Sequence, residues 1–298
     1  MEKFSNWRDK GTGISPFLPT AVQTSNIRKF VVNPAVVAAK WPLFALLYLL
    51  VSVAPKPATR LIFPWLFSIA DIDLLVEGVR KSNTKEIDAQ RPSLGEILVS
   101  NLVSPLDIFT IFLLSKVRSL SSIVVLIPWE NDLYKFTVWE SLSVFFLPIE
   151  SSISQGTKLE GNYQNAINGK LAVVFAEGTP SNNKAILPLQ QQCAELWLGL
   201  SIPVRVAVLR YYPSTISLPV PHVTRSQYVS KLFTSPGKAY IKVKIVPLKL
   251  PSLKMCQAAF VENGLNQVEL GCRRKPNSSS TSRITLWIKR KNGSLNTM

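Results

Sequence analysis

The fold is decided by two stretches of the chain, Ile97–Phe109 (ILVSNLVSPLDIF) and Leu171–Asn183 (LAVVFAEGTPSNN). Each begins with a short run rich in Val, Leu and Ile, which is typical of a buried β-strand. Each run then passes into polar residues, and the first continues into an apolar segment that predicts a helix. Open α/β sheets place their ligands where strands end and helices begin. Both stretches therefore predict one functional edge of a sheet.

The residues around these stretches alternate short β-rich runs with helical patterns. This alternation predicts an α/β domain at residues 93–251, with a mostly parallel sheet flanked by helices. The expected strands are Glu96–Ser100, Ile123–Ile127, Val144–Ile149, Ala172–Phe175 and Pro203–Leu209, and the expected helices are Leu106–Val117, Lys158–Asn168 and Leu187–Leu200. Ala239–Val246 alternates Lys with apolar residues, which predicts an edge strand with one wet face. We expect Asp71–Pro92 to be a linker of helix and loop.

Two apolar segments precede this domain, within residues 31–76. Trp41–Ala54 and Leu61–Ala70 are separated by Pro55-Lys56-Pro57, a strong helix breaker. As a helix, the first segment spans roughly 21 Å at about 1.5 Å per residue, which is short against a hydrocarbon core roughly 30 Å thick. We therefore predict a membrane-associated helix pair that enters one leaflet, with a true span and a buried core pair as alternatives.

Composition and charge favour an anionic surface as a partner. Hydrophobic residues make up 47% of the 298 residues and charged residues only 17%, while the formal net charge is +16. Most of the excess lies in the C-terminal third, where a field of one sign attracts anions. We expect a membrane or lipid-droplet surface and no nucleic acid, with a solvated basic face as the alternative. Residues 1–30 are expected to be a mobile polar arm, and residues 273–298 a basic, disordered tail.

Metal chemistry is not predicted. Cys193, Cys256 and Cys272 are widely spaced and form no CxxC pair, so no zinc site is expected. The first residues contain no apolar segment typical of a secretory signal.

Candidate site residues follow the two expected strands. Asn101, Ser104 and Asp107 lie where a strand gives way to a helix, near the positive end of the helix dipole. The same residue types are preferred N-caps, so a capping role is also open. After the second strand, Gly178 allows a sharp turn, and Glu177 can orient a polar substrate group. An ordinary exit from the strand is the alternative there.

Taken together, these blocks resemble the 1-acylglycerol-3-phosphate acyltransferase family. That family carries Asn-His-x-Ser-x-x-Asp at a strand–helix junction, then Phe-Pro-Glu-Gly-Thr-Arg-Ser, and then a strand rich in Pro and Val. Here the blocks read NLVSPLD at residues 101–107, FAEGTPS at 175–181 and IPVRVAV at 202–208. The resemblance covers about Lys40–Val246.

The resemblance implies a glycerolipid-acyltransferase fold and an acyl-CoA-dependent activity. The expected reaction acylates a lysophospholipid, above all lysophosphatidic acid, to phosphatidic acid at the cytosolic face of the endoplasmic reticulum and lipid droplets. Acyl-CoA is a co-substrate, so no bound cofactor is implied. Asp107 and Glu177 are the implied catalytic or orienting residues. The implied substrate-binding residues are Asn101, Ser104, Gly178, Thr179, Lys184 and Arg205, the last two as substitutes for missing phosphate-binding arginines at the same sheet edge.

Several positions depart from the family pattern, two of them in the motif blocks that would carry the chemistry. The family's histidine, which takes the proton from the acceptor hydroxyl, is Leu102 here, and Pro180 stands where an arginine would follow Glu-Gly-Thr. The single histidine, His222, lies in a Pro-rich loop that can fold back, with an ordinary loop histidine as the alternative. Two further hypotheses therefore stand: an inactive relative that binds lipid or acyl-CoA as a trafficking adaptor, and a basic trafficking factor without this activity.

Overall fold

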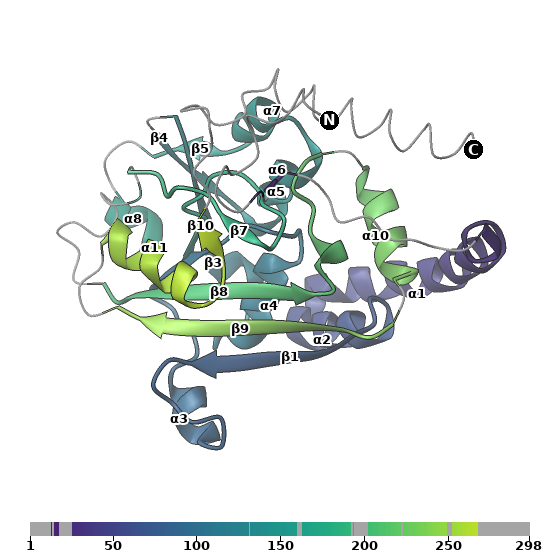
Figure 1. Ribbon diagram of the computed structural model, residues 1–298, viewed down its shortest axis with the longest axis horizontal. Helices are drawn as coiled ribbons and strands as arrows, with labels where there is room; N and C mark the ends of the chain where they lie inside the picture. The colour runs from purple at the N-terminus through teal and green to yellow at the C-terminus, as the bar shows by residue number, and fades with distance from the viewer. Residues whose placement is uncertain are drawn as a thin grey trace.

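The computed structural model describes residues 13, 15–17, 26–130, 132–159, 163–191, 193, 202–221, 223–235, 237–248 and 252–267. Within them, an eight-stranded sheet has the order β1-β9-β8-β2-β6-β3-β4-β5 (Figure 1). Its strands are β1 (Ile69–Val76), β2 (Ile97–Ser100), β3 (Ile123–Trp129), β4 (Asp132–Phe136), β5 (Thr157–Lys158), β6 (Leu171–Val174), β8 (Val204–Tyr212) and β9 (Ala239–Pro247). A separate short pair joins β7 (Ala185–Ile186) and β10 (Asn266–Gln267).

The centre of the sheet is parallel, as expected from the alternating pattern. The pairings β8–β2, β2–β6 and β6–β3 are parallel, and so is β1–β9. The pairings β8–β9, β3–β4 and β4–β5 are antiparallel. The predicted α/β class with a mostly parallel sheet is confirmed. The parallel centre brings the carboxyl ends of β2, β6 and β8 to one edge.

Helices cover both faces of the sheet (Figure 1). Alternate side chains of β2 enter two separate cores: Leu98 packs on the α4 side, and Ile97 and Val99 pack on the α11 side. The helices are α1 (Asn33–Val53), α2 (Pro55–Trp65), α3 (Thr84–Ala89), α4 (Asp107–Leu114), α5 (Val138–Ser141), α6 (Ser143–Phe146), α7 (Ile149–Ile153), α8 (Tyr163–Ile167), α10 (Arg225–Phe233) and α11 (Leu253–Glu262). Helices α2, α4 and α10 belong to the first core, and α8 and α11 to the second.

The N-terminal apolar helix is longer than its apolar core segment predicts. A helical run at Phe30–Val53 has 24 residues and a mean hydropathy of 2.0, with 6% of its most apolar window buried. At about 1.5 Å per residue, such a helix is long enough for a hydrocarbon core of roughly 30 Å. The helix ends at Val53, and α2 begins at Pro55, so an N-terminal pair of helices is present as predicted. Its second helix differs from the prediction, because Pro55–Pro57 forms the first turn of α2 and the helix ends at Trp65, before Ile69 and Ala70 enter β1. By length and composition, α1 is suited to membrane association.

Two secondary-structure predictions are wrong, and a third is right about the strand but wrong about its place in the sheet. Val144–Ile149 lies in α6 and the start of α7, because a short apolar run suits a buried helix as well as a strand. Asp71–Pro92 contains most of β1, because the exposed Asp71 and the half-buried Asp73 give this strand the polar composition of a linker. Ala239–Val246 is the predicted strand, with Lys242 exposed and Lys244 half-buried, but β1 pairs with it and takes the edge position.

Two helix predictions are only partly described. Lys158–Asn168 contains α8, which is shorter, and its first residue ends β5. Most of Leu187–Leu200 lies outside the described residues, and Leu187–Gln190 is not helical. The tail at 273–298, His222 and most of the arm at 1–30 also lie outside them.

Candidate active site

The two motif loops meet at the carboxyl edge of β2 and β6, as the sequence predicts. The Leu102 N–H donates a hydrogen bond of 3.1 Å to Glu177 Oε1, and the Leu187 N–H donates one of 2.9 Å to Glu177 Oε2. The Ser181 N–H donates to the Leu102 carbonyl at 2.8 Å. Glu177 is fully buried. Its carboxylate therefore ties the backbones of three loop segments together.

Asp107 performs a similar task within the first loop. Its Oδ2 accepts hydrogen bonds from the Val103 and Ser104 N–H groups at 2.7 and 3.0 Å. Its Oδ1 accepts one of 2.6 Å from the Tyr211 hydroxyl. Burial raises the pKa of Asp107 to about 7, although these three hydrogen bonds act to lower it. As placed, Asp107 holds its loop against the end of β8.

A second tyrosine anchors Ser104. The Ser104 hydroxyl lies 2.8 Å from the Tyr228 hydroxyl, which donates to the Ile216 carbonyl at 2.9 Å. The Ser104 oxygen also accepts from the Leu106 N–H at 3.2 Å. Burial raises the pKa of both Tyr211 and Tyr228, and the Asp107 charge raises that of Tyr211 further. Both phenols therefore stay neutral and act as hydrogen-bond groups.

Two asparagines extend the sheet beyond its last backbone ladder. Asn101 exchanges two hydrogen bonds with the Leu209 backbone, at 2.9 and 2.8 Å. Asn183 does the same with the Tyr211 backbone, at 2.7 and 3.1 Å. Asn183 has a positive φ of 66°, which asparagine tolerates better than most residues. These amides therefore position both loops relative to β8.

The loop after Glu177 contains a polar group without a partner. Gly178 has a φ of 69°, the left-handed region that favours glycine. Among the described residues, the adjoining Thr179 hydroxyl is buried and makes no hydrogen bond. Nearby, the Asn182 side chain donates to the Ser15 carbonyl at 2.8 Å, so part of the N-terminal segment lies against this loop. Thr179 is thus a donor available to a bound polar group.

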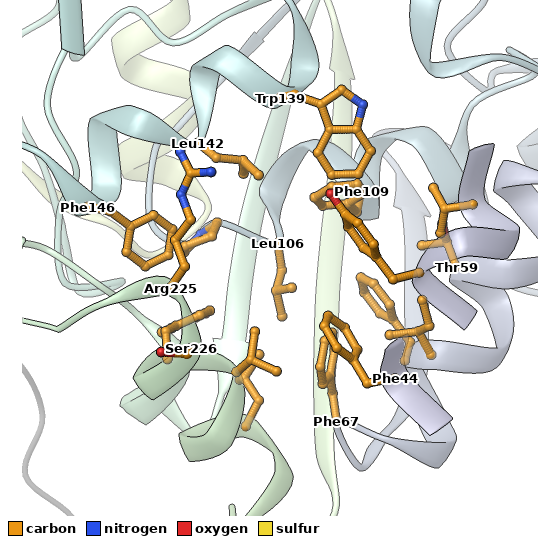
Figure 2. Close-up of a pocket in the computed structure, with 18 of the residues that line it drawn as sticks. Phe44, Thr59, Phe67, Leu106, Phe109, Trp139, Leu142, Phe146, Arg225 and Ser226 are labelled. Carbon is orange, nitrogen blue, oxygen red and sulfur yellow. The ribbon is translucent and has the colours of Figure 1, made fainter. Parts of the chain in front are cut away.

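An apolar cavity of about 390 Å³ adjoins the first loop (Figure 2). Pro105 and Leu106 form one wall, directly after Ser104, and the Tyr228 ring belongs to the same lining. Cavities of roughly 300–1,000 Å³ are typical of small-molecule sites. Its other walls come from α1, α2, α4, α5, α6 and α10, and include Phe44, Tyr48, Phe67, Phe109, Trp139, Leu142, Phe146, Arg225 and Val229. The lining suits a hydrocarbon chain.

The two expected phosphate-binding cations lie at different edges. Lys184 is exposed and follows Asn183 at the motif edge. Arg205 is the second residue of β8 and pairs with Leu98, near the start of β2. Its guanidinium contacts Glu96 at 3.2 Å and the Gln90 carbonyl at 2.6 Å. The expectation that Arg205 shares the motif edge is wrong, because it occupies the amino end of the parallel strands.

The structure also shows residues that the sequence patterns missed. Tyr211 and Tyr228 hold Asp107 and Ser104, yet both lie in ordinary strand and helix sequences. Leu102 is buried in the core and offers no titratable group. Within the described ranges, no group of three His, Cys, Asp or Glu side chains is placed to hold a metal ion.

Sequence comparison shows that the chain is similar to two fungal acyltransferases. It is 30% identical over 195 residues to lysophosphatidic acid:oleoyl-CoA acyltransferase 1 of Saccharomyces cerevisiae, covering 63% of this chain and 60% of that protein. It is 29% identical over 246 residues to a putative lysophosphatidic acid:oleoyl-CoA acyltransferase of Schizosaccharomyces pombe, covering 74% of this chain and 77% of that one. No protein-family model matches the chain.

One solved structure gives a partial overlap. The 1-acyl-sn-glycerophosphate acyltransferase of Thermotoga maritima aligns with a TM-score of 0.42 and 16% identity, covering 79% of this chain and 97% of that chain.

Proposed function

We propose that this chain transfers an acyl group from acyl-CoA to the free hydroxyl of a lysophospholipid, with lysophosphatidic acid as the acceptor. The names of the two fungal relatives support this reaction. The observation that carries it is the apolar cavity beside the loop of Ser104, which suits an acyl chain. The acceptor oxygen attacks the thioester carbonyl carbon, the C–S bond breaks, and the CoA thiol leaves with the hydroxyl proton.

Asp107 and Glu177 act in this proposal as positioning residues. Both carboxylates are fully buried, and their hydrogen bonds hold loop backbone. Asn101 and Ser104 shape the same loop, while Gly178 and Thr179 face the acceptor's polar end. Lys184 is the cation that meets its phosphate; Arg205 is excluded from this role by its place at the opposite edge.

Transfer without a histidine is energetically reasonable. Orientation of two bound reactants can supply roughly 7–11 kcal/mol of a barrier. General-base help is typically worth about 10²–10⁴-fold, and a thioester is already activated. In this proposal the fixed arrangement of the two substrates lowers the barrier, and no histidine is needed to accept the proton. We also propose that the reaction occurs at the cytosolic face of the endoplasmic reticulum and lipid droplets, with α1 and α2 in contact with lipid.

Product formation from labelled oleoyl-CoA and lysophosphatidic acid tests this function. The purified full chain should form phosphatidic acid, and Glu177→Gln should lower kcat about 10²-fold, because small displacements of bound reactants can cost that much. Asp71→Asn and Glu262→Gln, which change exposed carboxylates on β1 and α11, should leave the rate unchanged. If Glu177→Gln and Asp107→Asn both keep wild-type kcat, the proposed site is wrong.

A second function, binding without transfer, is favoured by Leu102 and by the occupied hydrogen-bonding positions of Asp107. In that case the chain binds acyl-CoA or lysophospholipid as a trafficking adaptor. Saturable binding of oleoyl-CoA with no phosphatidic acid formed by the wild-type chain would establish this function in place of the first.

A further inference from the structure

A second hollow lies on a different face of α2 from the acyl cavity. It has a volume of about 530 Å³, and its lining includes Lys56, Arg60, Arg91 and Ser115. These residues come from the start of α2, the loop before β2 and the end of α4. The hollow is therefore next to the turn between the two N-terminal helices and apart from the motif loops.

Positive charge is concentrated around this hollow. Burial lowers the pKa of Lys56, and the charges of Arg91, Arg60 and Arg118 lower it further. Asp88 supplies a counter-charge and pairs with Arg91 at 2.6 Å. Like charges held this close oppose one another, and a bound anion relieves that repulsion.

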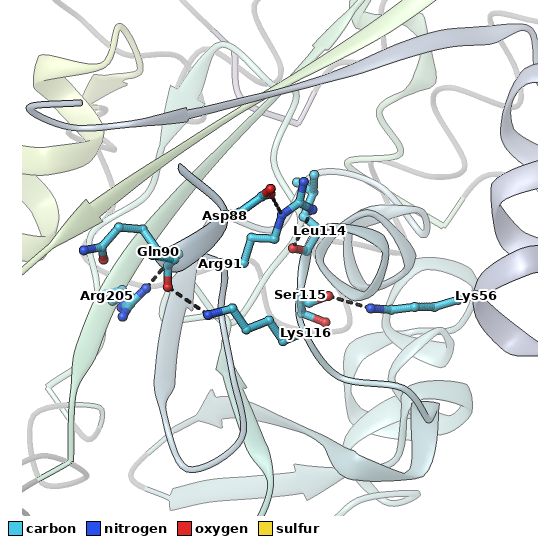
Figure 3. A network of polar contacts seen from close by, with 9 residues as sticks. Lys56, Asp88, Gln90, Arg91, Leu114, Ser115, Lys116 and Arg205 are labelled. Carbon is cyan, nitrogen blue, oxygen red and sulfur yellow. Dashed lines mark hydrogen bonds and ion pairs between the residues drawn. The ribbon is translucent and has the colours of Figure 1, made fainter. Parts of the chain in front are cut away.

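Two of these cations donate hydrogen bonds to carbonyl groups at the end of α4 (Figure 3). Lys56 donates to the Ser115 carbonyl at 2.6 Å, and Arg91 donates to the Leu114 carbonyl at 3.1 Å. Cations near a helix C-terminus satisfy its free carbonyls. This role uses one of the three N–H donors of Lys56 and, with Asp88, two of the five of Arg91. In the described part of the chain, Arg60 and Arg118 make no hydrogen bond or ion pair, so helix capping leaves them unexplained.

Exposed apolar side chains lie next to this turn and along α2. Val53, at the end of α1, is 82% exposed, and Leu61 and Trp65, on α2, are 43% and 71% exposed. Apolar side chains entering a membrane beside Lys and Arg heads are typical of a helix at a lipid surface. The surroundings therefore favour a lipid over a free anion.

We propose that the hollow formed by Lys56, Arg60 and Arg91 binds the phosphate group of an anionic membrane phospholipid, whose acyl chains lie against Val53, Leu61 and Trp65. Arginine presents a planar fork of donors that matches phosphate oxygens. The bound lipid holds the α1–α2 turn at the membrane surface. This site is independent of acyl transfer, because it lies apart from the motif loops.

Vesicle binding measured without acyl-CoA tests the site. The full chain should bind phosphatidylcholine vesicles containing phosphatidylinositol, and Arg60→Gln should weaken that binding about fivefold, as expected from about 1 kcal/mol per basic residue at such a surface. Binding to pure phosphatidylcholine vesicles should not change. Lys254→Gln removes the same charge from α11 on the other face of the sheet, and it should bind like the wild type.

A melting experiment separates the possible sources of phosphate. Water-soluble short-chain phosphatidylinositol should raise the melting temperature of the wild type more than that of Arg60→Gln at the same lipid concentration. Inorganic phosphate and CoA should give no such difference. Equal binding by Arg60→Gln and Lys254→Gln would overturn the site, and an Arg60-dependent shift with inorganic phosphate or CoA would overturn its assignment to lipid.

Discussion

At the scale of single residues, the motif side chains hold backbone in place. The Tyr211 hydroxyl lies 2.6 Å from Asp107, where the family resemblance assigns a histidine to the aspartate. Leu102 occupies the position of the family's histidine, and its side chain packs in the core. Its N–H donates a hydrogen bond to Glu177. The loop therefore keeps its contacts without an imidazole.

Glu177 and Asp107 should respond differently to amide substitution. Glu177 accepts a separate backbone N–H on each oxygen, so Glu177→Gln sets an NH₂ group against one of them, at a cost of about 1–3 kcal/mol. In Asp107→Asn the amide oxygen can accept both backbone bonds while its NH₂ donates to Tyr211. Urea unfolding should show the larger loss for Glu177→Gln. Equal losses would contradict these assigned hydrogen bonds.

The raised pKa of Asp107 predicts how stability depends on pH. The folded pKa is about 7, above the ordinary value of 3.8 for an aspartate. Between these values the folded state holds a proton that the unfolded state has lost, so this group's contribution falls by about 1.4 kcal/mol per pH unit as pH rises. The contribution is fully present below about pH 4 and is lost by about pH 7.

Asp107→Asn should remove this slope. Unfolding free energies measured from pH 4 to 8 would show a flatter curve for the variant than for the wild type, with Asp71→Asn as the exposed control. Parallel curves for the wild type and Asp107→Asn would mean that Asp107 stays ionised in the folded state.

Sequence reasoning found most of the polar site and missed its partners. Asn101, Ser104, Asp107 and Glu177 stand out because polar residues directly follow apolar strands. Tyr211 and Tyr228 do not stand out, since their roles arise from contacts more than 100 residues apart in sequence. Arg205 was misplaced because the pattern predicts a strand without showing which end of it faces the loops.

At the scale of elements, the cavity depends on how α1 and α10 meet. Lys40 of α1 donates to the carbonyls of Leu66 at the end of α2 and Phe233 at the end of α10, at 2.9 and 3.1 Å. Phe233 also packs against Trp41 and Phe44. These contacts fix α1 over the cavity, so its size is set by the three helices together.

Filling the cavity should change the choice of acyl chain. Val229 of α10 lines it, and Val229→Phe adds bulk that a long chain must displace. Overpacking costs about 1–3 kcal/mol, so kcat/KM for oleoyl-CoA should fall about tenfold relative to octanoyl-CoA. Val261→Phe on exposed α11 is the matched control. An unchanged ratio of the two kcat/KM values would show that the acyl chain does not bind in this cavity.

The parallel strands at the centre of the sheet were predictable, whereas helix α6 and the edge strand β1 were not. Strands β2, β6 and β8 carry continuous apolar runs because both their faces are buried. The run at α6 has the same composition, and periodicity cannot separate a short buried helix from a strand. Strand β1 was missed because Asp71 and Asp73 make this segment look polar, as suits a strand at the edge of a sheet. No local pattern shows that β1 pairs with β9.

At the scale of the whole molecule, apolar surface gathers on the N-terminal helix pair. Leu46 and Leu49 of α1 are 65% and 69% exposed. Monomeric soluble proteins rarely expose a contiguous patch of this kind. The fold therefore presents its cavity beneath a surface suited to lipid.

Charging that surface should release the protein from membranes. Leu46→Glu with Leu49→Glu removes two apolar insertions, each worth about 1.5–3 kcal/mol. Vesicle partitioning should therefore fall at least about a hundredfold in a flotation assay. Met255→Glu on α11, also exposed, should float like the wild type; equal flotation of all three proteins would rule out α1 as the lipid-facing element.

The most direct test of acyl transfer follows the thiol of CoA in the purified wild-type chain. Mixing it with oleoyl-CoA should release little thiol until lysophosphatidic acid is added, and then one CoA thiol should appear for each phosphatidic acid formed. Oleoyl-CoA that binds saturably yet stays intact in the presence of the acceptor would contradict the proposed activity.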